Sequence, residues 1–161
     1  MDDIYQMAQM FHQKFDDRAP KKPVALTDKE AGFRAEFMLE ELFEFLVADT
    51  EDKEEIKARA KAFHEALDRA VNKSLTKVRP QNETIVKQSD ALGDLIYLAY
   101  GTFVLMGVDP KDIINSIHQA NMDKLFADGK PHYDERTHKV LKPASWQGPE
   151  AGIKAAIEKQ K

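Results

Sequence analysis

Residues 36–47 read EFMLEELFEFLV, and this stretch decides the fold. Its large apolar side chains point in nearly every direction around a helix, which is typical of a buried helix. The remaining four residues are all glutamates, namely Glu36, Glu40, Glu41 and Glu44. They must therefore emerge into the interior of a helical bundle or into a cleft. We expect this helix to run from 28 to about 49, behind a capping box formed by Thr27 and Glu30.

Apolar residues at helical spacing continue on both sides of this stretch. They predict further helices over 2–16, 52–74, 83–106 and 109 to about 126, with Gly107 ending one helix and Asp109-Pro110 starting the next. From residue 128 onward the periodicity fails, and we expect an ordered tail or short hairpin, then a frayed helix over 149–161. The sequence predicts one all-α domain over residues 1–161, a four-to-five-helix bundle (core about 1–127) with a partly irregular C-terminal tail (128–161).

Composition excludes several classes of protein. The 161 residues include no cysteine, which excludes disulfide scaffolds and cysteine-based metal sites. The net charge is only −4 with both signs interspersed, so there is no basic surface for nucleic acid. The uncharged run over 95–108 is too short to span a bilayer, and the acidic N-terminus is not a signal peptide. We expect a soluble cytoplasmic protein with neither a nucleic-acid partner nor a membrane partner.

The glutamates of 36–47 lack local counter-charges. Glu36, Glu40 and Glu44 form one column along the helix and Glu41 lies beside it, while no Lys or Arg occurs between Arg34 and Lys53. Repelling carboxylates in a low dielectric are costly unless a cation joins them, and oxygen ligands suit a hard divalent ion. The alternative interpretation is that glutamate is simply a good helix former.

A second acidic pair lies in the expected helix over 83–106. Asp90 and Asp94 are one turn apart, although aspartate is a poor helix former. Asp90 could merely favour the helix start, but Asp94 lies too far along for that. Gly93 between them indicates a close approach by a neighbouring helix. Two facing helices that carry carboxylates and no imidazole would suit Mg²⁺, with Mn²⁺ as the alternative ion.

Cationic and amide side chains follow these acids in the sequence. Magnesium commonly takes substrate phosphates as ligands, so phosphate-binding residues are expected nearby. The candidates are Asn121 and Lys124 at the end of the fifth helix, then Lys130, Arg136, Lys139 and Lys142 in the tail. An ordinary solvated surface would have the same composition. If the cations do bind a nucleotide, we expect residues 128–143 to be mobile alone and to close over the substrate as a lid.

The order of these motifs resembles a known superfamily. Glu40-Glu41-Leu-Phe-Glu44, then Ala-Leu-Gly-Asp94, His118-Gln-Ala-Asn121-Met-Asp-Lys124 and Asp128-Gly-Lys130-Pro, resembles the all-α nucleoside triphosphate pyrophosphohydrolases over about residues 30–145. This superfamily includes MazG-like proteins and phosphoribosyl-ATP pyrophosphohydrolases. The resemblance implies a Mg²⁺-dependent hydrolase that cleaves a (d)NTP to (d)NMP and pyrophosphate, for nucleotide-pool house-cleaning.

The resemblance also implies roles for individual residues. Glu40, Glu41, Glu44 and Asp94 match the metal-binding acids. Where the family has an acid this chain has Ala91, and we expect Asp90, one residue earlier, to replace it. Asn121 and Lys124 match the nucleotide-contacting end, and Glu41 is our choice of catalytic base. Homodimers or homotetramers are implied, with residues 95–106 either at the interface or in the monomer's own core. The alternatives are a phosphoribosyl-ATP or other non-NTP pyrophosphohydrolase and, from another class, a non-catalytic metal-binding helical bundle.

Overall fold

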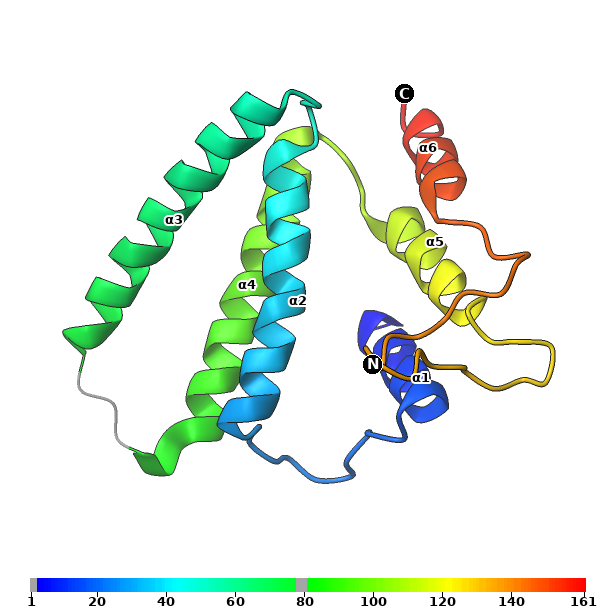
Figure 1. Cartoon of the computed structure of the whole chain (residues 1–161), viewed down its shortest axis with the longest axis horizontal. Helices are drawn as coiled ribbons and strands as arrows, with labels where there is room; N and C mark the ends of the chain where they lie inside the picture. Colours follow the sequence, from blue (N-terminus) through cyan, green and yellow to red (C-terminus); the bar gives the residue numbers. More distant parts are fainter. Residues whose placement is uncertain (1–2, 78–80) are drawn as a thin grey trace. The chain divides into compact units, whose positions relative to one another are not determined.

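The computed structural model describes residues 3–77 and 81–161. Within them the chain forms six α-helices, one short 3-10 helix and no strand beyond a single antiparallel bridge between Tyr133 and Val140 (Figure 1). The helices are α1 (Asp3–Phe15), α2 (Asp28–Val47), α3 (Lys53–Leu75), η1 (Gln81–Glu83), α4 (Thr84–Met106), α5 (Lys111–Met122) and α6 (Glu150–Glu158). The predicted all-α class is confirmed, and Asp2 of the first predicted helix lies outside the described residues.

The chain packs as two compact units. One consists of residues 1–22 and 92–161, and the other of residues 23–91. The first unit contains α1, α5 and α6 with the tail, and the second contains α2 and α3. Helix α4 begins in the second unit and ends in the first.

In the unit of residues 23–91, polar contacts fix the ends of α2 and α3. The backbone N–H of Glu30 donates to the Thr27 hydroxyl at 3.3 Å, and the N–H of Thr27 donates to the Glu30 carboxylate at 2.9 Å. The predicted capping box is therefore present. At the other end of α2, Arg59 of α3 donates to the carbonyl of Leu46 at 2.7 Å and forms an ion pair with Asp49. This hydrogen-bonded pair holds the pKa of the Asp49 carboxyl below its usual range.

Helix α2 is not buried, contrary to the expectation from its sequence. None of the described side chains of α2 or α3 is buried, and Leu42 and Phe45 are about half exposed. The two helices meet where the Phe43 and Phe63 rings lie 6.0 Å apart. A helix that is apolar all round needs neighbours on several sides, and α3 packs on one side of it.

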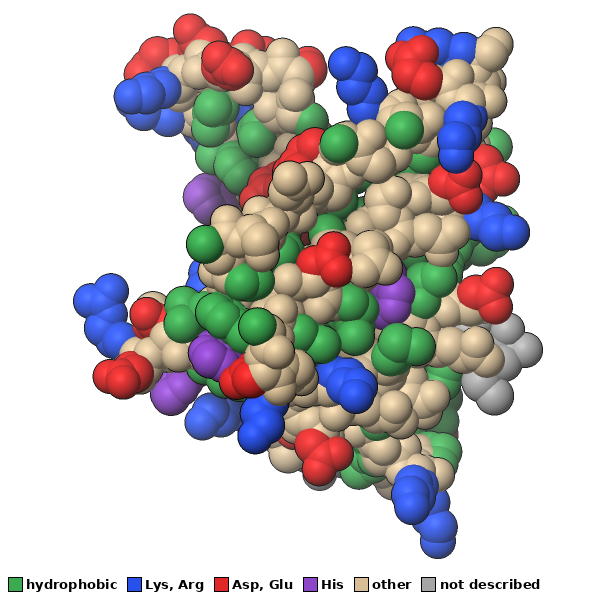
Figure 2. Space-filling model, turned by 90° about the vertical axis from the view of Figure 1, so that its right-hand side faces the viewer, with side chains coloured by type: hydrophobic (Ala, Val, Ile, Leu, Met, Phe, Trp, Pro, Cys, Tyr) green, Lys and Arg blue, Asp and Glu red, His purple; other side chains and the backbone are tan. Residues whose placement is uncertain are grey.

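The uncharged part of α4 is also exposed. Tyr97 is 79% exposed and Leu105 is 89% exposed, with no buried residue along the described helix. The possibility that residues 95–106 form the monomer's own core is therefore wrong. Apolar side chains also appear among charged ones on the face drawn in Figure 2.

The buried side chains of the described chain lie in the unit built on α5. Helix α5 packs against α1 and α6, and the residues buried there are Phe15, Ile113, Ala120 and Ala156. Hydrogen bonds join the residues after α6 to those before α5. The side chain of Gln160 accepts from the N–H of Asp109 at 2.7 Å and donates to the carbonyl of Asp109 at 3.0 Å. As predicted, Gly107 follows α4 with a positive φ of 66°.

Helix α5 ends at Met122, four residues before the predicted end. Turn hydrogen bonds follow, from Lys124 to Asn121 and from Leu125 to Met122. Phe126 then donates its N–H to the carbonyl of Lys130 at 3.0 Å. The chain therefore turns away at this point, although apolar residues continue to helical spacing as far as Phe126.

Gly152 allows the close packing of α6 on α5. A Cβ at this position would lie 2.6 Å from the Ser116 hydroxyl oxygen and 2.8 Å from the Ser116 Cβ. We expect Gly152→Ala to lower the free energy of unfolding by about 1–3 kcal/mol, the usual effect of overpacking. Gly32→Ala in α2 is the matched control, since a Cβ there meets nothing within 4 Å. It should be neutral or stabilise by up to about 1 kcal/mol.

Denaturant unfolding of both variants measures the difference. Ser116→Gly should partly rescue Gly152→Ala, because it removes the atoms that the new methyl group meets. Equal stabilities for the Gly152→Ala and Gly32→Ala variants would contradict the close approach of α6 to α5.

Candidate functional site

The predicted site residues divide between the two units. Glu40, Glu41 and Glu44 of α2 and Asp90 of α4 belong to the unit of residues 23–91. Asp94 and the amide and cationic side chains belong to the other unit; these are Asn121, Lys124, Lys130, Arg136, Lys139 and Lys142.

The α2 glutamates are exposed and unneutralised. Among the described residues, Glu40, Glu41 and Glu44 have no hydrogen bond or ion pair from a side chain. All three therefore keep free carboxylate oxygens, the donor atoms that suit a hard divalent cation. In the described part of the chain, no three Asp, Glu, His or Cys side chains lie close enough to hold an ion together. The donor chemistry thus fits a metal, and the structure of this single chain does not assemble a complete set of ligands.

The acidic pair of α4 is likewise exposed. Asp90 and Asp94 are one turn apart on this helix, and both face solvent. Gly93 does not mark the helix contact that its sequence position suggested, because a Cβ built there meets nothing within 4 Å. At Gly93, between the two acids, no neighbouring helix packs against α4.

The tail packs against the unit of α1 and α5 and is not a free lid. Tyr133 donates its hydroxyl to the carbonyl of Phe15, and the Trp146 indole donates to the carbonyl of Ala120 at 2.7 Å. The His132 ring stacks on Phe126 with centroids 4.0 Å apart and lies 2.9 Å from Asp128. The expectation that residues 128–143 are mobile without a ligand is therefore wrong. The sequence offered few apolar residues there, but aromatic and hydrogen-bonded contacts replace them.

A tight turn in the tail presents two of the candidate cations. The Asp134 carboxylate accepts hydrogen bonds from the backbone of Thr137 at 2.7 Å and from its hydroxyl at 2.8 Å. These bonds hold the pKa of Asp134 below its usual range. Arg136 and Lys139 lie in this turn, and both are exposed. Asp134 thus orders the segment that carries them.

The end of α5 brings together two more of the predicted site residues. Lys124 donates its ammonium to the Asn121 side-chain oxygen at 2.7 Å, so these two predicted residues are in contact. The Lys142 ammonium lies over the Trp146 ring, 4.0 Å from its centroid. Trp146 was not among the predicted site residues, although a single tryptophan in a polar, cationic tail was a usable signal.

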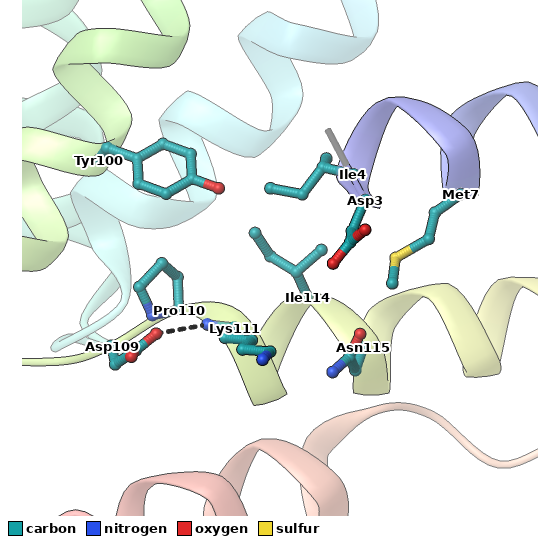
Figure 3. A pocket seen from close by; sticks show the side chains of 9 residues that line it. All are labelled: Asp3, Ile4, Met7, Tyr100, Asp109, Pro110, Lys111, Ile114 and Asn115. Carbon is teal, nitrogen blue, oxygen red and sulfur yellow. Dashed lines mark hydrogen bonds between the residues drawn. The ribbon is translucent and has the colours of Figure 1, made fainter. Parts of the chain in front are cut away.

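A cavity of about 320 Å³ lies elsewhere in the same unit (Figure 3). The side chains of Ile4 and Met7 from α1 and Ile114 from α5 point toward it, and Asp109 accepts from the N–H of Lys111 at 2.9 Å on its edge. Asp109 was predicted to be the N-cap of this helix with Pro110 as its first residue, but the N-cap is Pro110 and α5 begins at Lys111 without a side-chain capping bond. The described residues that line the cavity include none of the predicted site residues.

Comparisons with known proteins identify the family of the chain. Residues 8–121 match the family described as phosphoribosyl-ATP pyrophosphohydrolase (PRA-PH). A crystal structure from Exiguobacterium sp. 255-15, described as a candidate NTP pyrophosphohydrolase, superposes with a TM-score of 0.90. The two sequences are 36% identical, and the match covers 99% of this chain and 96% of the other. Comparison with curated proteins finds no match.

The helical fold and the acid-bearing helices thus define a protein of the MazG-like, all-α pyrophosphohydrolase class. Within that class, the chain belongs to the phosphoribosyl-ATP pyrophosphohydrolase family. It is a hydrolase that acts on phosphoric anhydrides. None of the described helices is long and apolar enough to cross a membrane.

The Asp134 turn gives a prediction that depends on pH. A lowered pKa in the folded protein means that Asp134 stabilises the turn above the pKa of the unfolded chain. That contribution is lost as the pH falls through the lowered folded value. An NMR titration should therefore give Asp134 a midpoint below 3.8, with loss of amide protection at Thr137 over the same pH range.

Thr137→Val is the variant that tests the cause. It removes the hydroxyl donor and keeps the backbone donor, so the Asp134 midpoint should move upward toward 3.8. An unchanged midpoint would show that the hydroxyl does not contribute to the shift.

Proposed function

We propose that this protein hydrolyses (d)NTPs to (d)NMPs and pyrophosphate with the help of Mg²⁺, as a house-cleaning enzyme of the nucleotide pool. The observation that carries the proposal is the row of exposed, unneutralised carboxylates on α2 in a chain of this family. Glu40, Glu41 and Glu44, with Asp90 and Asp94, are the proposed ligands, and Mn²⁺ could replace Mg²⁺. When bound, the metal would offset the negative charge of the substrate phosphates.

The chain's own residues have distinct roles in this proposal. Water attacks the α-phosphorus, the bond to the bridging oxygen breaks, and pyrophosphate leaves. Glu41 takes the proton of the attacking water as general base. Asn121 and Lys124 contact the nucleotide, and the tail cations Lys130, Arg136, Lys139 and Lys142 stabilise the charge of the leaving group.

The choice of an NTP rests on the extent of the structural likeness. The family match ends at residue 121, whereas the likeness to the Exiguobacterium protein extends over nearly the whole chain, including the tail. That protein is described as acting on NTPs. Phosphoribosyl-ATP is the second candidate substrate, because the family description names it.

A panel of nucleotides, with phosphoribosyl-ATP included, tests the reaction and the substrate together. With Mg²⁺ we expect (d)NMP and pyrophosphate from at least one (d)NTP, because attack occurs at the α-phosphorus. Chromatography of the products distinguishes this from attack at the γ-phosphorus, which releases orthophosphate. Orthophosphate as the first product, or turnover of phosphoribosyl-ATP alone, would contradict the proposal.

In the same assay, Glu41→Gln and Asp94→Asn should lower kcat to background, since a neutral amide is a weaker ligand for a hard cation. Glu65→Gln on α3 is the matched control and should keep full activity. Both site variants should stay folded, because removing one of several repelling charges does not destabilise the helices. Full activity in either site variant would contradict the assignment.

We further propose that the chain functions as a homodimer or homotetramer. The support is the exposed apolar surface of the described α2, α3 and α4, where no side chain is buried. The unit of residues 23–91 cannot offset the entropy of folding with so little burial. A second copy presents the same apolar helices and is the simplest partner for them.

Leu105→Glu tests the proposed interface. Leu105 is 89% exposed on α4, and a buried, unpaired charge in its place should dissociate the oligomer. Val24→Glu is the matched control, since Val24 is 62% exposed and lies before α2, outside the three helices of the proposed interface. Sedimentation velocity should show dimers or tetramers for the parent and control, and smaller species for Leu105→Glu. A monomeric parent protein at micromolar concentration would contradict the proposal.

A further inference from the structure

The cavity of about 320 Å³ in Figure 3, which we call the α1–α5 cavity, has a role that the proposed function does not use. Its apolar wall comes from three helices of one unit, through Ile4 and Met7 of α1, Ile114 of α5 and the Tyr100 ring of α4. Figure 3 shows the Tyr100 side chain pointing toward Ile4. Apolar walls with a few polar groups, at about this volume, are typical of a small-molecule site.

Three polar side chains that line the α1–α5 cavity keep free hydrogen-bonding capacity. In the described part of the chain, no group bonds to the Asp3 carboxylate, the Asn115 amide or the Tyr100 hydroxyl. A carboxylate can only accept a hydrogen bond, whereas an amide can both donate and accept. Asp3 belongs to α1 and Asn115 to α5, so a ligand in the cavity meets an acceptor from one helix and an amide from the other.

The charges around the cavity do not suit a phosphate group. The lining residues include two carboxylates, those of Asp3 and Asp109, and one ammonium, that of Lys111. Their sum is negative, so an anion would be repelled. A flat, uncharged ring with N–H donors fits this lining, because the ring can stack on an aromatic side chain while its N–H groups bond to a carboxylate.

We propose that the α1–α5 cavity binds a nucleobase that carries an exocyclic amino group, as cytosine and adenine do. The base stacks on Tyr100, its amino group donates to the Asp3 carboxylate, and the Asn115 amide donates to the adjacent ring nitrogen. A carbonyl oxygen in place of the amino group, as in uracil, would meet the carboxylate without a donor between them. The inference goes beyond the proposed function, since binding of a base does not depend on hydrolysis.

The cavity and the proposed interface at Leu105 lie on different sides of α4. Leu105 follows Tyr100 by five residues, which places the two side chains about 140° apart around the helix. A second copy that contacts Leu105 therefore does not need to cover Tyr100.

Nucleosides without phosphate test the cavity directly in the full-length protein. In uridine a carbonyl oxygen replaces the amino group of cytidine, and inosine differs from adenosine in the same way. Cytidine and adenosine should shift the NMR methyl signals of Ile4, Met7 and Ile114 in a saturable way, while the signal of Ile56 on α3 stays unchanged. Their dissociation constants should be about tenfold lower than those of uridine and inosine, the usual effect of one hydrogen bond to a charged group.

Two pairs of variants test the residues in these roles. Asp3→Asn should abolish the preference for cytidine over uridine, because an amide can both donate and accept. Asp68→Asn on α3 is the matched control and should keep the preference. Tyr100→Leu should weaken cytidine binding about tenfold, and Tyr100→Phe should restore it, because the base stacks on the ring.

The outcomes separate this inference from the proposed function. No saturable methyl shifts, shifts confined to residues outside the cavity, or equal dissociation constants for cytidine and uridine would overturn the inference and leave the function in place. If cytidine binds as expected but no (d)NTP is hydrolysed, the proposed function is wrong and the base site stands.

The activity assay distinguishes two sources of the base. If the base of the substrate occupies the cavity, Asp3→Asn should raise the KM for CTP about tenfold and leave the KM for UTP unchanged. If both KM values stay unchanged while cytidine still shifts the methyl signals, the cavity binds the base of a separate nucleoside or nucleotide.

Discussion

The apolar surface of α2 and α4 is the constraint on which the other features of this protein depend. Burial of apolar area is the main favourable term in folding, and the described α2, α3 and α4 contain no buried side chain. Helix α3 contacts α2 through the polar contacts of Arg59 with Leu46 and Asp49 and through the Phe43 and Phe63 rings. Such exposed pairs add little stability. The acids of the candidate site lie on these same helices, so whatever covers the apolar faces also sets how much water reaches the carboxylates.

The sequence predicted the helices well where a local signal marks their ends. Thr27 with Glu30 and the positive φ of Gly107 are contacts or conformations within a few residues, and the structure has both. The end of α5 was predicted four residues late, because the Phe126 contacts that turn the chain involve Lys130 and His132. The prediction that α2 is buried was wrong for a different reason. An apolar pattern shows that a helix needs neighbours, but it does not show whether the same chain supplies them.

The residue types of the candidate site were predictable from the sequence, but the contacts of its tail residues were not. Residue types and helical spacing are enough to select Glu40, Glu41 and Glu44 as carboxylates without local counter-charges. Spacing says nothing about contacts between residues far apart in sequence, such as Trp146 with Ala120 or Tyr133 with Phe15. Each of these joins a tail side chain to a backbone carbonyl, and any residue type can supply that carbonyl. The docked tail was therefore beyond sequence reasoning, although its charges were visible.

The two groups of site residues carry charges of opposite sign. Some charged side chains elsewhere in the described chain have a partner of opposite sign, as Arg59 has in Asp49 and Glu55. The α2 glutamates have no such partner, and Lys142 contacts a neutral aromatic ring instead. Exposed charges without a partner stay solvated, so they cost no solvation energy until they become buried. A ligand that carries charges of both signs can compensate both groups. A polyphosphate with its divalent cation is such a ligand, because its metal seeks carboxylates while its phosphate oxygens seek ammonium groups.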